Sequence, residues 1–360
     1  MEFVSIIHPS PTTKSERLKA IAEPGFGNCF SDHMVLIEYD ENKGGWFSAK
    51  IGPREPILLD PAASVLHYAQ EIFEGMKCFK HCDGSMALFR PQENARRFNA
   101  SARRMAMPEI PENLFVKAVC ELVKKDKDWV PEIDGGALYI RPFMFASEAF
   151  LGVRPAKQYK FMVIISPAGS YFKNGPAPVK IWVSNDFVRA APGGTGAAKT
   201  GGNYAASLVP QAEAIQQECD QVVFLDAVER QWIEELGGMN LFFVFNDQTV
   251  ITPPLSGTIL PGITRDSLIH LIKEEGLKIR EEPYSIDQWK SDAESGTLLE
   301  AMACGTAAVV TPIGTVAGHQ GEFTIGNGTA GPLTTKIREK LVNIQKGLEK
   351  DTHGWVVKVN

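Results

Sequence analysis

Short apolar runs bounded by glycine, proline and polar residues constrain the fold of this chain most strongly. Their length and their apolar character are typical of strands. The predicted strands cover 34–39, 86–89, 137–140, 161–165, 179–184, 222–225 and 241–245. Between them lie segments with apolar residues at helical spacing, at 91–105, 111–130, 203–217, 264–275 and 333–348. Helices and strands do not alternate strictly, so the sequence predicts an α+β or mixed α/β fold rather than a doubly wound sheet.

The 360-residue length predicts about two domains, at roughly 100–200 residues per domain. The segment 167–178 is rich in proline, glycine, serine and asparagine, which is typical of a linker. We therefore expect a smaller N-terminal domain over 1–170, an interdomain loop over 171–183 and a larger C-terminal domain over 184–360.

A net charge of −6 argues against a protein that binds nucleic acid or an anionic membrane, since such proteins carry a basic surplus. The sequence contains no run of about 18 apolar residues, so it predicts no membrane-spanning helix. The N-terminus has no secretory signal pattern. These observations favour a cytoplasmic protein. The close trio Cys78, His81 and Cys82 lacks the second ligand pair that a zinc site needs, so no metal is expected.

The most unusual segment is 192–204, where Lys199 lies among five glycines. A nucleotide-binding P-loop needs glycine directly before its lysine, and Ala198 stands there instead. A solvated lysine in a surface turn remains one reading. A lysine that forms a Schiff base with pyridoxal phosphate is the other, because glycines allow the backbone to approach a cofactor closely.

A lysine with this role would need three further groups: a partner for the ring nitrogen of the cofactor, a phosphate site and a site for the substrate carboxylate. Glu235 could pair with the ring nitrogen of the cofactor, although it could also be an exposed acid at a helix end. The turn and helix start at 260–267 could bind a phosphate through backbone amides, or be an ordinary helix cap. The small-residue turn at 303–307 could hold a carboxylate, or reflect close packing alone.

Several motifs, taken together and in order, resemble the fold-type IV pyridoxal-phosphate enzymes, and within them the longer form of the branched-chain amino-acid aminotransferases. The C-terminal motifs are Lys-x-Gly-Gly-Asn-Tyr at 199–204, Glu-x-Gly-x-Met-Asn at 235–240, Leu-Pro-Gly-x-x-Arg at 260–265 and Gly-Thr-Ala at 305–307. The N-terminal motifs are Phe-Glu-Gly-Met-Lys at 73–77, Leu-Phe-Arg-Pro at 88–91, Leu-Tyr-Ile-Arg-Pro at 138–142 and Ser-Glu-Ala-Phe-Leu-Gly-Val at 147–153. The resemblance runs from about Asp32 to about Gln345.

This resemblance implies a two-domain fold of that type and reversible amino transfer between L-leucine, L-isoleucine or L-valine and 2-oxoglutarate. It implies that Lys199 is the catalytic residue and bears pyridoxal phosphate, that Glu235 pairs with the ring nitrogen, and that Tyr204 bonds the ring hydroxyl. The phosphate would be held by Arg90, Ile263, Thr264 and Thr306, with Arg189 near it, and Leu260 would also bind the cofactor.

The resemblance also implies a pocket that accepts both an apolar side chain and a γ-carboxylate. Phe73, Tyr68, Tyr139 and Tyr171 would form its walls, and the Thr306–Ala307 turn would bind the substrate carboxylate. Arg141 is our candidate for the γ-carboxylate, because an unpaired buried carboxylate is costly. Tyr68, Leu151 and Val153 would come from the second subunit of a homodimer.

Two positions depart from the family pattern. Ala308 and Thr311 stand where animal members carry a redox Cys-x-x-Cys, so no thiol switch is expected. Gly238 stands where those members have threonine. A D-amino-acid aminotransferase and an aminodeoxychorismate lyase are the alternatives within the fold type, and a catalytically silent binding protein is the alternative outside it.

Overall fold

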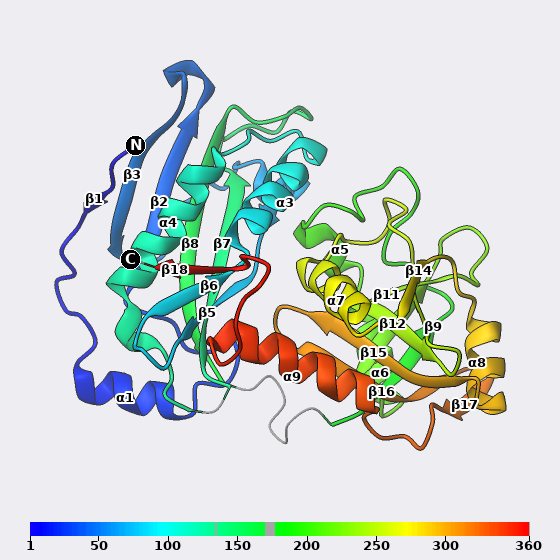
Figure 1. Ribbon diagram of the computed structural model, residues 1–360. Helices are drawn as coiled ribbons and strands as arrows, with labels where there is room; N and C mark the ends of the chain where they lie inside the picture. The colour runs from blue at the N-terminus through cyan, green and yellow to red at the C-terminus, as the bar shows by residue number, and fades with distance from the viewer. Residues whose placement is uncertain (134, 170–176, 360) are drawn as a thin grey trace. The chain divides into compact units, whose positions relative to one another are not determined.

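A computed structural model describes residues 1–133, 135–169 and 177–359 of the chain (Figure 1). Its described residues form two compact units. Unit 1 takes the residues up to 169 together with 198–201 and 343–359, and unit 2 takes 177–197 and 202–342. The expected domains 1–170 and 184–360 stay a prediction about independently folding parts. Most of the segment 167–178 lies outside the described residues.

Unit 1 is built on one sheet with the strand order β1-β3-β2-β8-β7-β5-β6-β18, and β4 pairs with β7. Apart from the parallel pair of β1 and β3, neighbouring strands are antiparallel. The strands are β1 (Val4–Ser5), β2 (His33–Asp40), β3 (Gly45–Pro53), β4 (Glu71–Phe73), β5 (Met76–Lys80), β6 (Met86–Phe89), β7 (Ala137–Ala146), β8 (Gln158–Ala168) and β18 (Val356–Val359).

Four α-helices belong to unit 1: α1 (Lys14–Ala22), α2 (Val65–Tyr68), α3 (Pro91–Arg104) and α4 (Glu112–Lys125). In Figure 1, α3 and α4 pack on one another and α4 lies against β2 and β8. The buried rings of Phe98, Phe115 and Phe161 meet in this layer. The core of unit 1 therefore lies between these helices and the sheet.

Unit 2 is built on a mixed sheet with the order β11-β10-β9-β16-β15-β12-β13-β14, and β17 pairs with β16. Its strands are β9 (Val179–Ser184), β10 (Gln221–Leu225), β11 (Ile233–Leu236), β12 (Asn240–Phe245), β13 (Thr249–Thr252), β14 (Lys278–Glu281), β15 (Leu298–Gly305), β16 (Val309–Gly318) and β17 (Gly321–Thr324). Its helices are α5 (Gly201–Ala205), α6 (Leu208–Gln216), α7 (Ile263–Glu274) and α8 (Ile286–Ser295). Helix α9 (Pro332–Lys346) begins in unit 2 and ends in residues of unit 1.

The core of unit 2 is aromatic where α8 meets the sheet. Trp289 of α8 is fully buried and its ring contacts Phe243 of β12 at 4.8 Å, edge to face. With strands and helices combined in this way, the mixed α/β class expected from the sequence is confirmed. Among the described residues no helix is long and apolar enough to cross a membrane.

The sequence predicts a helix over 203–217 that Pro210 should start, kink or break, with Ala205, Leu208, Val209 and Ala212 on its apolar face. The structure has two helices, α5 and α6, in its place, and Pro210 lies in the first turn of α6, where a missing backbone N–H is tolerated. The predicted apolar face is wrong, since Leu208 and Val209 are 68% and 56% exposed, whereas Pro210 and Ala214 are buried.

Candidate functional site

The segment that carries Lys199 packs with unit 1 through its backbone. The Lys199 N–H donates to Oγ of the buried Ser101 on α3 at 2.8 Å. The carbonyl of Lys199 accepts the N–H of Phe73, the last residue of β4, at 3.0 Å. Both backbone groups of the lysine are therefore fixed, and its side chain starts from a defined position.

The lysine amine and one guanidinium both lie near the same aromatic ring in unit 1. Lys199 Nζ lies 4.9 Å from the ring centre of Phe73, and the Arg141 guanidinium lies 4.8 Å from the same ring. Arg141 and Tyr139 are two residues apart on β7, so they share a face, and Arg141 Nη2 donates to the Tyr139 hydroxyl at 3.2 Å. The structure thus brings together four of the residues predicted from sequence.

Glycine at position 75 is required by this arrangement. A Cβ atom there would lie 2.2 Å from the Tyr139 hydroxyl oxygen, which is far inside contact distance. Tyr139 is further held by Phe26, whose ring packs edge to face on it at 4.8 Å. Gly75 of the Phe-Glu-Gly motif therefore makes room for the hydroxyl that contacts Arg141.

Two carboxylates that the sequence analysis did not single out flank this group. Glu74 is fully buried and its Oε1 lies 2.7 Å from Nε of Arg97. Burial opposes the ionisation of Glu74, but the charge and hydrogen bonds of Arg97 outweigh it and lower its pKa, with a further contribution from the charge of Lys199. The sequence signal that could have identified these carboxylates is the presence of two acids, Glu71 and Glu74, on either side of Phe73.

Glu71, the other carboxylate, holds the lysine segment. Its Oε1 accepts hydrogen bonds from the Thr200 hydroxyl at 3.2 Å and from the Gly201 N–H. Burial raises the pKa of Glu71, and these two bonds and the charge of Arg141 offset only part of the rise.

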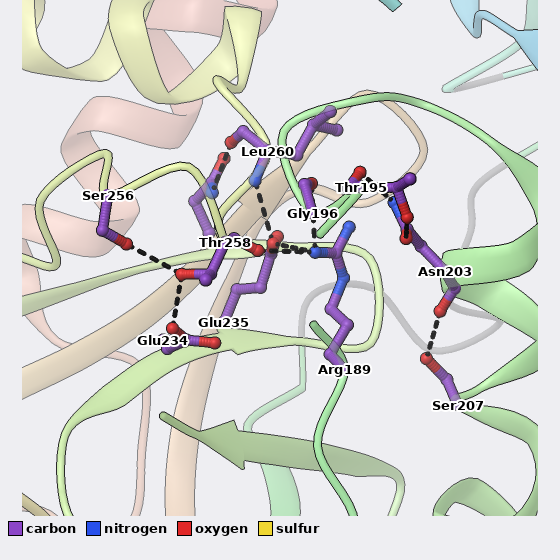
Figure 2. A network of polar contacts seen from close by, with 11 residues as sticks. Arg189, Thr195, Gly196, Asn203, Ser207, Glu234, Glu235, Ser256, Thr258 and Leu260 are labelled. Atoms are coloured by element: carbon purple, nitrogen blue, oxygen red, sulfur yellow. Dashed lines mark hydrogen bonds and ion pairs between the residues drawn. The ribbon is translucent and has the colours of Figure 1, made fainter. Parts of the chain in front are cut away.

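Unit 2 contains a buried ion pair between Glu235 of β11 and Arg189 (Figure 2). Arg189 Nη1 lies 2.7 Å from Glu235 Oε1 and also donates to the carbonyls of Gly196 at 3.3 Å and Thr258 at 3.0 Å. The N–H of Leu260 donates to the same carboxylate oxygen at 2.9 Å. Because Glu235 lies inside a strand, the reading of an exposed acid at a helix end is wrong.

Glu234 precedes Glu235 on the same strand and has separate partners. The Thr258 hydroxyl donates to Glu234 Oε1 at 2.5 Å and is itself in contact with the Ser256 hydroxyl at 2.7 Å (Figure 2). Burial raises the pKa of Glu234, and the hydrogen bond from Thr258 offsets part of that rise. Glu235, by contrast, is the acid that Arg189 and Leu260 contact.

The turn before α7 is fixed by polar contacts from β11 and β12. Leu260 uses its N–H on Glu235, and its carbonyl accepts the Asn240 side-chain amide at 3.1 Å. Gly262 is the N-cap and has no side chain with which to cap the helix; a Cβ on Gly262 would lie 2.0 Å from Asn240 Oδ1. The helix N-terminus at Ile263 and Thr264 therefore has the polarity that suits an anion.

The remaining predicted residues of unit 2 lie at strand and helix ends. Thr306 and Ala307 lie in the turn that joins β15 to β16, whereas Ala303, Cys304 and Gly305, expected in that turn, belong to β15. Tyr204 is in α5, and a Cβ on Gly238 would meet its Cε1 at 3.6 Å, an ordinary contact. Position 238 therefore has room for a side chain, and glycine there is not imposed by packing.

The other predicted residues of unit 1 lie near the surface. The hydroxyl of Tyr68 donates to the carbonyl of Leu151 at 2.5 Å, and Leu151 and Val153 are 64% and 89% exposed. Arg90 precedes α3 with a left-handed φ of 51°, and its guanidinium lies 5.3 Å from the ring centre of Trp355. Tyr171 lies outside the described residues. The roles assigned to all these residues stay predictions.

The chain matches the family described as amino-transferase class IV over residues 71–316. It is 50% identical to a branched-chain-amino-acid aminotransferase of Mycolicibacterium smegmatis, covering 100% of this chain and 99% of that protein. A branched-chain-amino-acid aminotransferase of Mycobacterium tuberculosis is 51% identical, at 100% and 98% coverage.

Solved structures of similar proteins indicate the same family as the sequence relatives. The branched-chain amino acid aminotransferase of Escherichia coli superposes with a TM-score of 0.75 at 29% identity, covering 91% of this chain and 99% of that one. A second branched-chain amino acid aminotransferase, solved as a complex with N-(5'-phosphopyridoxyl)-L-glutamate, gives a TM-score of 0.73 at 27% identity, with 90% and 98% coverage. The chain therefore belongs to the class IV aminotransferases and, within them, to the branched-chain amino-acid aminotransferase family.

Proposed function

We propose that the protein uses pyridoxal phosphate to transfer the amino group of L-leucine, L-isoleucine or L-valine to 2-oxoglutarate, and that the reaction is reversible. The observation that carries this proposal is the grouping around Lys199. A lysine with both backbone groups fixed has its amine beside an aromatic ring that also contacts a guanidinium. Such a group offers an amine for the chemistry, an apolar wall for a branched side chain and a cation for a carboxylate.

The residues present fit the cofactor on the chemistry of their donor groups. Lys199 supplies the amine, and Glu235 supplies a buried carboxylate for a protonated ring nitrogen. The N-terminus of α7, whose N-cap is a glycine, suits the phosphate through the first-turn residues Ile263 and Thr264. Arg90, Arg189, Tyr204 and Thr306 keep the roles that the family resemblance implies.

When bound, pyridoxal phosphate supplies an electron sink for the pair of electrons left when the Cα proton is removed. Lys199 would take this proton on Nζ and later give it up, so that one amine would serve as base and then as acid. Its reach is set by two hydrogen bonds that hold its backbone: its N–H donates to Ser101 Oγ and its carbonyl accepts the N–H of Phe73. Glu235 keeps a proton on the ring nitrogen, and Arg189 orients its carboxylate.

One pocket has to accept both an isobutyl group and the γ-carboxylate of 2-oxoglutarate. Phe73 and Tyr139 offer apolar faces, and Arg141 offers a cation in contact with both rings. The buried Nε atom of Arg141 has no hydrogen-bond partner among the described residues, so its N–H can donate to an incoming carboxylate. We assign Arg141 to the γ-carboxylate, with Tyr68 as a helper.

We also propose a homodimer with shared sites. In support, Leu58, Leu66, Leu151 and Val153 of unit 1 are each more than half exposed. Large exposed apolar side chains in two neighbouring segments are typical of an interface. The bond between Tyr68 and Leu151 links the two segments.

The test uses the purified protein loaded with pyridoxal phosphate, and follows the visible absorbance of the bound cofactor. L-leucine added alone should bleach the band, and 2-oxoglutarate should then restore it, because the two half-reactions are separate. D-alanine in a second sample should leave the band unchanged. Bleaching by D-alanine and not by leucine would overturn the substrate assignment in favour of a D-amino-acid aminotransferase.

A further inference from the structure

The strongest unassigned feature of the chain is the carboxylate of Glu71, next to the lysine segment in unit 1. One of its oxygens, Oε1, accepts two hydrogen bonds from residues that directly follow Lys199. A Cβ on Gly201 would lie 2.5 Å from this oxygen, so the carboxylate and the backbone are in close contact there. Together with Ser101 and Phe73, Glu71 fixes three consecutive residues, 199–201, against β4 and α3.

Arg141 needs a counter-charge when the pocket holds an uncharged side chain. The Nε atom of Arg141 is buried and has no hydrogen-bond partner among the described residues. A cation in such surroundings is costly unless a negative charge is near. Glu71 supplies that charge: it lies two residues from Phe73 on β4, so both side chains share one face of the strand, and the Arg141 guanidinium lies 4.8 Å from the ring centre of Phe73. In support, the charge of Arg141 offsets part of the rise that burial causes in the pKa of Glu71.

We propose that Glu71 is a positioning residue that holds the Lys199 segment through Oε1 and balances the charge of Arg141, so that the pocket accepts apolar side chains as well as a γ-carboxylate. The proposal rests on the function proposed above. With leucine bound, Arg141 is balanced by Glu71. With 2-oxoglutarate bound, the γ-carboxylate competes with Glu71 for the same guanidinium, so the negative charge of Glu71 favours leucine over 2-oxoglutarate.

Two substitutions separate the two roles of Glu71. Glu71→Gln keeps an oxygen that accepts the bonds from Thr200 and Gly201 but removes the charge, whereas Glu71→Ala removes both. Glu55→Gln is the matched control, because Glu55 is exposed and the net charge changes equally. Thermal unfolding of all three proteins checks that they are folded.

The first readout is hydrogen exchange, followed by mass spectrometry in the cofactor-free protein over peptides covering 198–204. Glu71→Ala should raise the exchange of this segment by about tenfold or more, whereas Glu71→Gln and Glu55→Gln should stay near wild type. Unchanged exchange in Glu71→Ala would overturn the holding role. This readout does not depend on the reaction.

The second readout is the KM of the loaded enzyme for each substrate. Glu71→Gln should raise the KM for leucine and lower the KM for 2-oxoglutarate, each by roughly three- to tenfold. A change of both KM values in the same direction would overturn the charge-balance role. If the wild type itself did not transaminate leucine, the proposed function would fail, and the exchange measurement would still decide the holding role.

Discussion

Buried charges set the local chemistry of this protein at the scale of single residues. Glu74 with Arg97 in unit 1, and Glu235 with Arg189 in unit 2, are each ion pairs in which both side chains are at least nine-tenths buried. Such a pair contributes little net stability compared with apolar residues, but removing one partner leaves an uncompensated charge. The exposed pairs of the chain lack this asymmetry because water screens them.

Glu74→Gln should therefore lower the free energy of unfolding by roughly 3–5 kcal/mol, because the charge of Arg97 is left buried without its carboxylate. Glu132→Gln is the control, since Glu132 is 75% exposed and pairs with the exposed Lys80, and should cost less than about 1 kcal/mol. Denaturant unfolding of the two variants measures both. Equal losses in the two variants would contradict this account of Glu74.

The stability that Glu74 contributes also depends on pH with a definite sign. Its folded pKa lies below its ordinary value of 4.5, so its contribution is present above that value and is lost as the pH falls through the folded pKa. Wild type should therefore lose more unfolding free energy between about pH 6 and pH 3 than Glu74→Gln does, by denaturant titration at each pH. A parallel loss in both proteins would contradict the lowered pKa.

Arg141→Met tests the assignment of the γ-carboxylate. Methionine preserves apolar bulk against Phe73 and Tyr139 but removes the cation, so the half-reaction with 2-oxoglutarate should slow at least about tenfold more than that with leucine. Stopped-flow absorbance of the two half-reactions gives both rates. Equal decreases in the two half-reaction rates would contradict the assignment, since they would indicate a structural role for Arg141.

At the scale of secondary-structure elements, the sequence predicted those parts whose local signals agree with their packing. Strands β6 and β9 coincide with the predicted runs, and α3 begins at Pro91, where a missing N–H is tolerated. The hydrogen-bonded strands β15 and β16 were missed, because small residues and threonines carry no clear alternation.

The candidate site also contains residues that the sequence predicted and residues that it did not. Lys199, the turn before α7 and the neighbours Tyr139 and Arg141 were singled out from sequence motifs. Glu71 and Glu74 were not singled out, because their partners, Gly201 and Arg97, are distant in sequence and only the fold brings them together.

Gly196 tests how the glycine-rich loop packs on the segment before α7. A Cβ on Gly196 would lie 2.3 Å from the Thr258 carbonyl oxygen, whereas nothing lies within 4 Å of a Cβ on Gly202. Gly196→Ala should cost at least about 2 kcal/mol of unfolding free energy, because backbone atoms have to shift. Gly202→Ala should be neutral or slightly stabilising in thermal unfolding; equal behaviour of the two variants would show that the loop does not pack as described.

At the scale of the whole molecule, the chain does not divide at one point. Residues 343–359 return to unit 1, where β18 pairs with β6, and the four residues 198–201 join unit 1 from within the sequence of unit 2. The lysine that we assign to the chemistry is thus held by elements that precede it by about a hundred residues, such as Ser101. Non-local contacts of this kind follow from topology and are not visible as local patterns in a sequence.

Self-association belongs to this scale. Val153→Glu should weaken the proposed homodimer at least about tenfold, because it places a charge among the exposed apolar residues near Tyr68. Ile215→Glu on α6 is the control, since Ile215 is 64% exposed in unit 2, outside that surface. Sedimentation velocity over a concentration series measures both, and unaltered association of Val153→Glu would remove this surface from the proposed interface.

The central claim is that Lys199 bears the cofactor, and covalent trapping tests it most directly. The protein loaded with pyridoxal phosphate is reduced with borohydride, digested, and its lysine-containing peptides are analysed by mass spectrometry. The account predicts a phosphopyridoxyl group on Lys199 and its absence when the protein is first converted to the amino form of the cofactor by leucine. A stable adduct on another lysine, with Lys199 unmodified, would contradict the assignment.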